Sequence, residues 1–330
     1  MSRPKVFVTR PSVPKEGIDL LRKTCDVEVY DEEKPIPREA LLKGVAGKDA
    51  LLCLLTDPID KEVLDVAGPQ LKVIATMSAV FRFDHIDLEE CKKVSNTPHV
   101  STDSVAEFTV LLMLAVGRQL FDSAAAIKKV RLTSCEMGEW VYSWSPLWLC
   151  GQGLKDATVG IVGMGRIGQA VLKRLLPFGI AKALYHDVFH PIPPAEEMGA
   201  IYTPFEDLLK QSDYVVAMCN LSEETRGIFN KKAFELMKPS AVFVNTSRGG
   251  VVNQDDLYDA LKSGQIRAAG LDVMIPEPLP KDHKLTTLPN IALLPHVASA
   301  EVSVRILMAE MAANNILNAL DGKALVSPVY

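Results

Sequence analysis

The sequence is poor in the features that mark metal-binding and disulfide-rich proteins. Its six cysteines lie far apart, at positions 25, 53, 91, 135, 150 and 219, and no two form a C-x-x-C pair. This spacing gives no sign of a structural metal or a disulfide framework, and it is typical of free thiols in a reducing compartment. We therefore expect a cytoplasmic protein without a metal site.

Long hydrophobic runs and an excess of positive charge are also missing. No stretch approaches the roughly 20 apolar residues of a membrane span. The net charge of −5 argues against nucleic acid or an anionic membrane as the main partner. A strand predicted at residues 5–10 leaves no room for a cleavable targeting segment, and we expect none. The 330 residues suffice for two domains of ordinary size.

What the sequence does contain is a glycine-rich turn between a predicted strand, 157–163, and a predicted helix, 166–176. Gly163, Gly165 and Gly168 have the Gly-x-Gly-x-x-Gly spacing. The first glycine permits a sharp turn, the second lets the backbone approach a pyrophosphate, and the third lets the helix pack close to the strand. A tight turn alone could select the same glycines. In this context, however, the motif predicts a nicotinamide dinucleotide site at the helix N-terminus.

An acidic residue follows the motif where a dinucleotide ribose requires one. Asp187 comes after the next predicted strand, 183–185, about 20 residues beyond Gly168. A carboxylate at this place accepts hydrogen bonds from a ribose 2′-hydroxyl and repels a 2′-phosphate. We expect NAD(H) or NADP(H) as cofactor, with Asp187 favouring NADH. The alternative is that Asp187 is a solvated loop acid.

Strand and helix patterns alternate along the whole chain. The first part has predicted strands at 6–9, 27–30, 50–55 and 71–77 and predicted helices at 14–24, 38–45 and 60–67. A second series follows position 157, with further strands at 183–185, 214–218, 241–245, 268–273 and 291–294. Such alternation predicts an α/β protein with parallel sheets and crossover helices.

Two long helices suggest where the domains meet. A capping box, Ser104-Val-Ala-Glu107, predicts the start of an apolar helix that runs to about Leu120. The last helix, 299–321, ends before Gly322. It has more apolar positions than packing against the dinucleotide-binding sheet alone requires. We therefore expect a discontinuous substrate domain, 1–103 with the returning helix 298–330, around a dinucleotide domain at 104–297.

Candidate chemistry follows three later predicted strands. Arg248 comes after one strand, Asp272 and Glu277 after the next, and His296 after the last. Ligands of open α/β sheets lie beyond the carboxyl ends of the strands, so these side chains are expected to converge. Singly, they could be a surface ion pair, a loop acid and a core histidine. Jointly, they indicate a catalytic group.

These residues, with the stretches around them, carry a family resemblance. The stretches are Leu51-Leu-Cys-Leu-Leu55, Ala75-Thr-Met-Ser78, Trp144-Ser-Pro-Leu-Trp-Leu-Cys150, the glycine motif, Ser247-Arg-Gly-Gly-Val-Val-Asn-Gln-Asp-Asp-Leu257, Pro276-Glu-Pro-Leu-Pro280 and Pro295-His296. The chain resembles the D-2-hydroxyacid dehydrogenase family, and within it the branch that reduces glyoxylate and hydroxypyruvate. The resemblance implies two doubly wound domains, a Rossmann domain inserted into a flavodoxin-like one, and a homodimer.

The resemblance also implies roles for the residues. His296 would give a proton to the carbonyl oxygen of a small 2-oxo acid as hydride arrives, yielding glycolate or D-glycerate. Glu277 would orient the His296 ring, and Arg248 would bind the substrate carboxylate. Further substrate contacts would come from Ser78, Ala79 and Val80. Further cofactor contacts would come from Arg166, Ile167, Asn220, Thr246, Asp272 and Ser299.

One stretch departs from the family pattern. A Ser-x-Gly turn is usual where this chain reads Ser78-Ala-Val-Phe-Arg-Phe83, without the glycine and with added residues. Glycine serves where backbone must approach a ligand closely. The alternative function is therefore a catalytically impaired dinucleotide-binding homologue, either corepressor-like or an aberrant variant. A further alternative is a different 2-hydroxyacid dehydrogenase. Measurement of turnover with different substrates would distinguish it from a glyoxylate and hydroxypyruvate reductase.

Overall fold

The structure, a computed structural model, describes residues 2–78, 86, 94–125 and 146–329 of the chain. These residues form two compact units. One comprises Met1–Ser101 and Ala300–Tyr330, and the other comprises Thr102–Ser299. Each unit contains one sheet in which all strands are parallel. The predicted α/β class with two parallel sheets is therefore confirmed.

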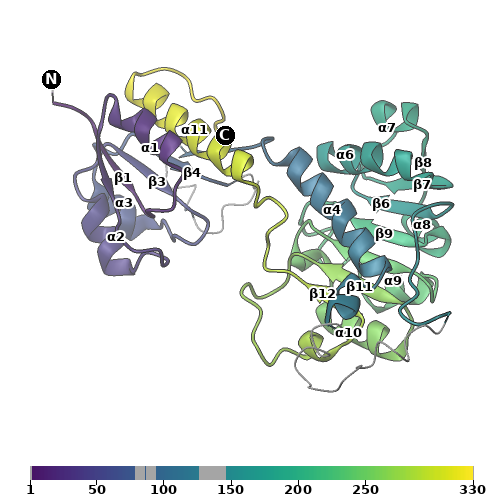
Figure 1. The fold of residues 1–330 in the computed structure, drawn as a ribbon. Coiled ribbons are helices and arrows are strands. Elements are labelled where there is room, and N and C mark those ends of the chain that lie inside the picture. Colours follow the sequence, from purple (N-terminus) through teal and green to yellow (C-terminus); the bar gives the residue numbers. More distant parts are fainter. Residues whose placement is uncertain (1, 79–85, 87–93, 126–145, 330) are drawn as a thin grey trace. The chain divides into compact units, whose positions relative to one another are not determined.

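The first unit is a five-stranded sheet in the order β2-β1-β3-β4-β5. Strands β1, β3 and β4 are labelled in Figure 1. The strands are β1 Lys5–Val8, β2 Asp26–Val29, β3 Ala50–Cys53, β4 Val73–Thr76 and β5 Val94–Ser95. The helices are α1 Lys15–Arg22, α2 Arg38–Val45, α3 Lys61–Ala67 and α11 Val302–Leu320. The two-residue strand β5 is too short for the sequence pattern to predict.

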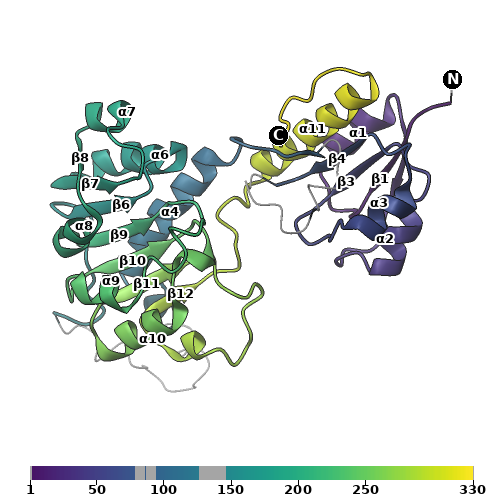
Figure 2. The ribbon, with the colours of Figure 1, turned by 180° about the vertical axis from the view of Figure 1, so that it is seen from behind.

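The alternation of side chains along each strand fills both faces of this sheet. Val6 and Val8 of β1 pack with α1 and α11, whereas Phe7 packs with α2 and α3. Helices α1 and α11 lie side by side, as both ribbon views show (Figures 1 and 2). Gly17 allows this approach, because a Cβ there would lie 2.6 Å from the carbonyl oxygen of Ala309.

The end of the chain closes the β5 edge of the same sheet. The hydroxyl of Ser327 donates to the Asn96 carbonyl at 2.6 Å, and the Val329 N–H donates to the Val94 carbonyl at 3.0 Å. Asn315 of α11, fully buried, accepts from the Ser327 N–H at 3.1 Å. These bonds satisfy an edge that would otherwise expose unpaired backbone groups.

The second unit is a seven-stranded sheet in the order β12-β11-β10-β9-β6-β7-β8. The strands are β6 Thr158–Val162, β7 Lys182–His186, β8 Ala200–Tyr202, β9 Tyr214–Ala217, β10 Val242–Asn245, β11 Ala268–Leu271 and β12 Ile291–Leu293. The helices are α4 Thr102–Gly117, α6 Arg166–Leu175, α7 Pro193–Glu197, α8 Phe205–Gln211, α9 Lys231–Leu236 and α10 Gln254–Ser263. Apolar side chains of α4 and α6 cover one face, and those of α8, α9 and α10 cover the other.

The predicted capping box at the start of α4 is wrong. The helix begins at Thr102, so Ser104 lies inside it and not at its cap. The Ser104 hydroxyl donates to the carbonyl of Ala298 at 3.1 Å, and Glu107 lies 3.4 Å from Arg174. Local sequence favours a cap, but a tertiary hydrogen bond in the buried interior uses the hydroxyl instead.

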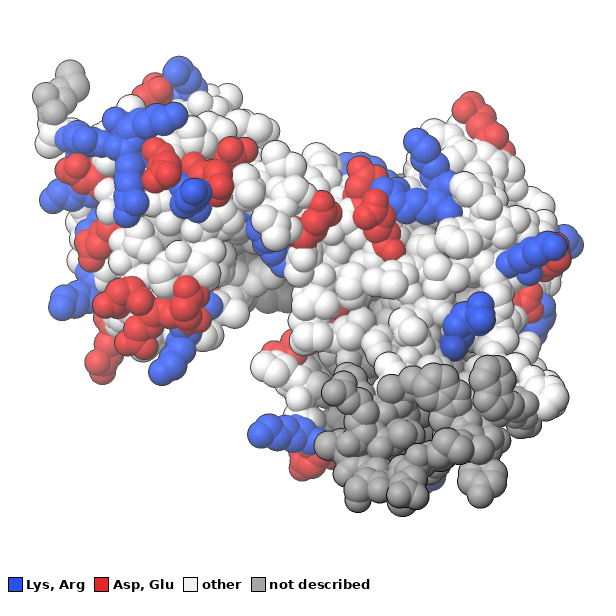
Figure 3. Space-filling view, in the orientation of Figure 1, with Lys and Arg blue, Asp and Glu red and all other residues white. Residues whose placement is uncertain are grey.

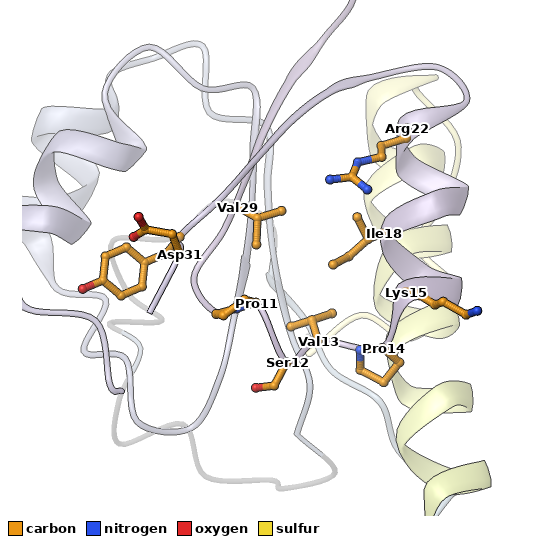
Figure 4. Close-up of a pocket in the computed structure, with 10 residues that line it drawn as sticks. Pro11, Ser12, Val13, Pro14, Lys15, Ile18, Arg22, Val29 and Asp31 are labelled. Carbon is orange, nitrogen blue, oxygen red and sulfur yellow. The ribbon is translucent and has the colours of Figure 1, made fainter. Parts of the chain in front are cut away.

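The surface of the first unit has a hollow, and charges of both signs are mixed on the face shown in Figure 3. A hollow of about 650 Å³ lies between α1 and the end of β2 and is lined by Ser12, Lys15, Arg22 and Asp31 among others (Figure 4). None of the predicted site residues lines it. On the face in Figure 3, positive and negative side chains of the described residues are interspersed. No helix in the described part of the chain is long and apolar enough to span a membrane.

Candidate active site

Most of the predicted site residues follow strands of the seven-stranded sheet. Because all seven strands run in one direction, the segments after them gather at one edge of the sheet. The residues that follow β6, β7, β9, β10, β11 and β12 are Gly163, Asp187, Asn220, Thr246 with Arg248, Asp272 with Glu277, and His296. The topology thus brings the candidate cofactor and catalytic residues to a common edge.

The turn after β6 has the geometry of a phosphate cradle. Gly163 has a φ of 98°, which side chains disfavour, and Gly165 has open space where a Cβ would stand. A Cβ on Gly168 would lie 2.3 Å from the Gly163 carbonyl oxygen, so only glycine permits this packing. Gly165 caps α6 without a side-chain hydrogen bond. The first N–H groups of α6 are thus available for a pyrophosphate, and the residues present fit a dinucleotide.

Asp187 lies beside this turn. Its carboxylate accepts from the Met164 N–H at 2.7 Å and from the Phe189 N–H at 3.0 Å. Both bonds fix the carboxylate next to the glycine turn. Val188 and Phe189, the two residues after Asp187, are 74% and 81% exposed, so the loop presents apolar rather than cationic side chains.

His296 sits on a loop with unusual backbone conformation. Its φ is 54°, in the left-handed region that few residues other than glycine adopt. Asp272, fully buried, accepts from the N–H groups of Val297 and Ala298, both at 2.8 Å. The Asp272 carbonyl accepts the His296 N–H at 2.8 Å. Burial raises the pKa of Asp272, and the two N–H donors lower it only in part.

The His296 ring and the Glu277 carboxylate form a close pair. The distance from His296 Nδ1 to Glu277 Oε2 is 2.8 Å, and the side chains are 37% and 36% exposed. The other Glu277 oxygen accepts from the Met274 N–H at 2.9 Å. Burial acts to raise the pKa of Glu277, but His296, Met274 and the charge of Arg248 outweigh it, so the pKa lies below its ordinary value. Glu277 is therefore ionised at neutral pH, and its carboxylate can accept a hydrogen bond from the Nδ1 of His296.

Arg248 is the cation of this cluster. Burial lowers the pKa of its guanidinium, and the charge of Glu277 opposes that shift. An arginine nevertheless keeps its charge in proteins. Asn245, at the end of β10, shapes the turn by donating to the Arg248 carbonyl and accepting the Ser247 N–H, both at 2.9 Å. The Nη1 of Arg248 donates to the Ser247 carbonyl, and the side chain makes no other hydrogen bond to the residues that the structure describes. Such a partly buried cation is suited to bind an anionic ligand.

The remaining predicted residues are placed as follows. Arg166 is exposed and Ile167 is half-buried at the start of α6. The Thr246 hydroxyl lies 2.7 Å from that of Thr109, and the Asn220 carbonyl accepts from Thr225. Ser299 is half-buried at the end of the second unit. Ser78 belongs to the first unit, where its carbonyl accepts the Thr97 N–H at 2.8 Å. Ala79 and Val80 lie outside the described residues.

Sequence reasoning does not single out Asn245 or the true role of Ser104 as supports of the site. Both are small polar residues whose partners are backbone groups, and the sequence carries no signal for such pairing beyond their position at an element end.

No group of three or more His, Cys, Asp or Glu suited to a metal occurs among the residues that the structure describes. The cluster therefore combines an ionised acid, an imidazole and a guanidinium on the same sheet edge as the glycine turn. It can exchange a proton with a bound anion.

Comparison with known proteins agrees with this geometry. A sequence profile for the NAD binding domain of D-isomer specific 2-hydroxyacid dehydrogenases matches residues 110–298. The human protein named glyoxylate reductase/hydroxypyruvate reductase is 48% identical over 329 residues, which cover 98% of this chain and 97% of that protein. The chain belongs to the D-isomer specific 2-hydroxyacid dehydrogenase family. The predicted family is thereby confirmed.

Two solved structures extend the likeness to the fold. A protein of Thermus thermophilus has a TM-score of 0.87 and 38% identity, with coverage of 99% of this chain and 100% of that one. The NADPH-dependent glyoxylate/hydroxypyruvate reductase of Sinorhizobium meliloti, solved with NADP and malonate, has a TM-score of 0.78 and 26% identity. Here coverage is 99% of this chain and 97% of that one. This dehydrogenase thus shares both domains with its relatives.

The low pKa of Glu277 predicts a pH-dependent contribution to stability. A group whose pKa is lower in the folded state stabilises the protein above its unfolded pKa, about 4.3 for glutamate, and loses that effect as pH falls through the folded value. Between pH 5 and 3, the unfolding free energy of wild type should therefore fall more steeply than that of Glu277→Gln. Urea unfolding at several pH values measures this, with Glu235→Gln, an exposed acid of α9, as control. Parallel curves for wild type and Glu277→Gln would contradict the assignment.

Proposed function

We propose that this dehydrogenase reduces glyoxylate to glycolate and hydroxypyruvate to D-glycerate with NADH or NADPH. The observation that carries the proposal is the His296–Glu277 pair, at 2.8 Å, on the same sheet edge as Arg248 and the glycine turn. The human relative, 48% identical over nearly the whole chain, is named for both substrates. The turn after β6 would hold the cofactor, and Ser78, Ala79 and Val80 would add substrate contacts.

Each catalytic side chain would have one task. A bound nicotinamide cofactor would supply the hydride for the carbonyl carbon, and the protein would have to neutralise the charge on the carbonyl oxygen. His296, protonated and oriented by Glu277, would donate its Nε2 proton to that oxygen. Arg248 would bind the substrate carboxylate and polarise the carbonyl. The overall change is addition of one hydride and one proton to the 2-oxo acid.

We further propose that the enzyme prefers NADH. Asp187 holds its carboxylate at the glycine turn through Met164 and Phe189, where a ribose 2′-hydroxyl could donate to it. A 2′-phosphate would meet this negative charge without a compensating Lys or Arg between Asp187 and Pro194. The Sinorhizobium meliloti relative, in contrast, is named NADPH-dependent.

A homodimer in the cytoplasm completes the proposal. Five large apolar side chains of the second unit are exposed on α4 and in the segments that follow it: Leu111, Leu120, Phe121, Leu147 and Trp148. The surface over the later part of α4 is largely uncharged (Figure 3). Several exposed large apolar side chains on one helix and in the segments that follow it favour an interface between chains. A reducing compartment suits the thiols of Cys25, Cys150 and Cys219, which form no disulfide among the residues that the structure describes.

Replacement of His296 tests the catalytic assignment directly. Wild type should oxidise NADH when either glyoxylate or hydroxypyruvate is added. His296→Gln should lower kcat by about 10²–10⁴-fold, the usual contribution of general acid catalysis. Cofactor binding, measured by quenching of NADH fluorescence, should be retained. The exposed His99 gives a matched control, because His99→Gln should not change turnover.

The outcomes separate the alternatives. If wild type binds NADH but reduces neither acid, the chain is better described as a catalytically impaired dinucleotide-binding homologue. If wild type reduces another 2-oxo acid faster by a wide margin, the substrate assignment is wrong and the family mechanism stands. If His296→Gln loses cofactor binding together with turnover, the residue is structural.

Cofactor preference is tested at Asp187. Asp187→Ala removes the acceptor for the ribose hydroxyl and the repulsion of a 2′-phosphate, so it should weaken NADH use and improve NADPH use. The ratio of kcat/KM for NADH to that for NADPH should fall by at least about 10-fold, which corresponds to the loss of one hydrogen bond to a charged group. An unchanged ratio would rule out the ribose assignment.

The dimer proposal predicts that a charge on the apolar surface dissociates the protein. Wild type should have twice the chain mass in light scattering, and Leu111→Asp should shift the equilibrium to single chains, because a buried unpaired charge opposes association. Ile201→Asp, a change at an exposed apolar residue of β8, is the matched control. A monomeric wild type would overturn the proposal.

A further inference from the structure

We propose that Gln254 is a positioning residue, which holds the loop that carries Glu277 and thereby sets the His296–Glu277 pair. The expected effect on turnover rests on the proposed function. The hydrogen bonds between Gln254 and Ile275, called the clamp below, rest on geometry alone. Gln254 is the first residue of α10, after the N-cap Asn253, and is half-buried.

The side-chain amide of Gln254 makes two hydrogen bonds to one backbone residue. Its Nε2 donates to the carbonyl of Ile275 at 2.6 Å, and its Oε1 accepts the N–H of Ile275 at 2.7 Å. The amide therefore pairs its donor with the carbonyl of Ile275 and its acceptor with the N–H of Ile275, as neighbouring strands pair in a sheet. Such two-point pairing fixes both the position and the orientation of the Ile275 backbone.

The loop at Ile275 needs this support. Met274 is buried, but the chain emerges to solvent at Ile275, which is 51% exposed, and Pro276–Pro278 are exposed as well. Pro276 and Pro278 have no N–H to donate. Among the residues that the structure describes, Gln254 is the partner of the backbone hydrogen bonds of 275–278. The other hydrogen bonds of this segment, within the described part of the chain, are those of the Glu277 carboxylate, which accepts from the Met274 N–H and pairs with His296.

The clamp also joins the loop to the segment that carries Arg248. The 3₁₀ turn Gly249–Val251 lies between Arg248 and α10, and Gly249 packs so closely on Met274 that a Cβ would lie 2.3 Å from the Met274 carbonyl. Met274 is thus packed against Gly249, and the next residue, Ile275, is hydrogen-bonded to Gln254. A shift of this loop would change the positions of Glu277 relative to both His296 and Arg248.

The experiment replaces Gln254 in two ways in the full-length protein. Gln254→Ala removes both hydrogen bonds. Gln254→Glu retains size and one acceptor but turns a second oxygen toward the Ile275 carbonyl. We expect both variants to lower kcat roughly 10-fold, since small misplacements of catalytic groups have large effects on rate. KM for NADH should stay within about twofold of wild type. Gln211→Ala, which removes an exposed amide on α8 that donates to the Asp207 carbonyl, is the matched control.

A spectroscopic measurement tests the clamp without any turnover. In protein labelled with ¹⁵N-histidine, the Nδ1 proton of His296, assigned among the six histidines with His296→Gln, reports its hydrogen bond to Glu277. Gln254→Ala and Gln254→Glu should shift this signal toward free imidazole or broaden it by exchange, whereas Gln211→Ala should not.

The results distinguish this inference from the proposed function. Absent turnover in wild type would refute the function and leave the clamp to be decided by the histidine signal. An unchanged signal in both folded variants would overturn the clamp even where turnover is present. Full activity of Gln254→Glu beside a defective Gln254→Ala would also overturn it, because packing and not the paired hydrogen bonds would then be responsible.

Discussion

The site depends above all on one buried carboxylate. Asp272 uses both of its oxygens to bind the N–H groups of Val297 and Ala298, and its own carbonyl accepts the N–H of His296. These three bonds hold His296 at a φ of 54°, a conformation that costs energy for any residue with a side chain. Without them the loop would relax, and the imidazole would no longer meet Glu277. The two hydrogen bonds partly offset the hydration that this carboxylate loses when it is buried.

A parallel sheet supplies the second constraint. Since every strand of the second unit ends at the same edge, residues separated by more than a hundred positions come together without long loops of their own. Each then acquires a local tether: Met164 holds Asp187, Asn245 shapes the turn of Arg248, and Ser104 of α4 binds the carbonyl of Ala298. The active-site loops are therefore irregular in conformation but fixed by hydrogen bonds to regular elements.

The sequence is sufficient for whatever depends on periodicity and on chemically distinctive residues. The strands around the glycine turn, the parallel class of both sheets and the set of Arg248, Glu277 and His296 follow from such signals. The supports do not follow from them. Ser104 resembles a helix cap because caps and tertiary donors are the same residue types, and only the folded chain shows that its hydroxyl reaches residue 298. Asn245 and Gln254 bind backbone groups, which carry no mark in the sequence.

Catalytic power and cofactor choice can vary independently in this fold, because the candidate residues for each are held by separate sets of contacts. Asp187 and its exposed neighbours Val188 and Phe189 form a separate turn after β7, whereas His296, Glu277 and Arg248 are tied to one another through Asp272 and Met274. A change after β7 would alter the charge beside the glycine turn without breaking any of those contacts. A change in the Asp272 or Met274 network, in contrast, would act on His296, Glu277 and Arg248 together. Selection on the cofactor can therefore act at β7 while the proton-transfer group stays fixed.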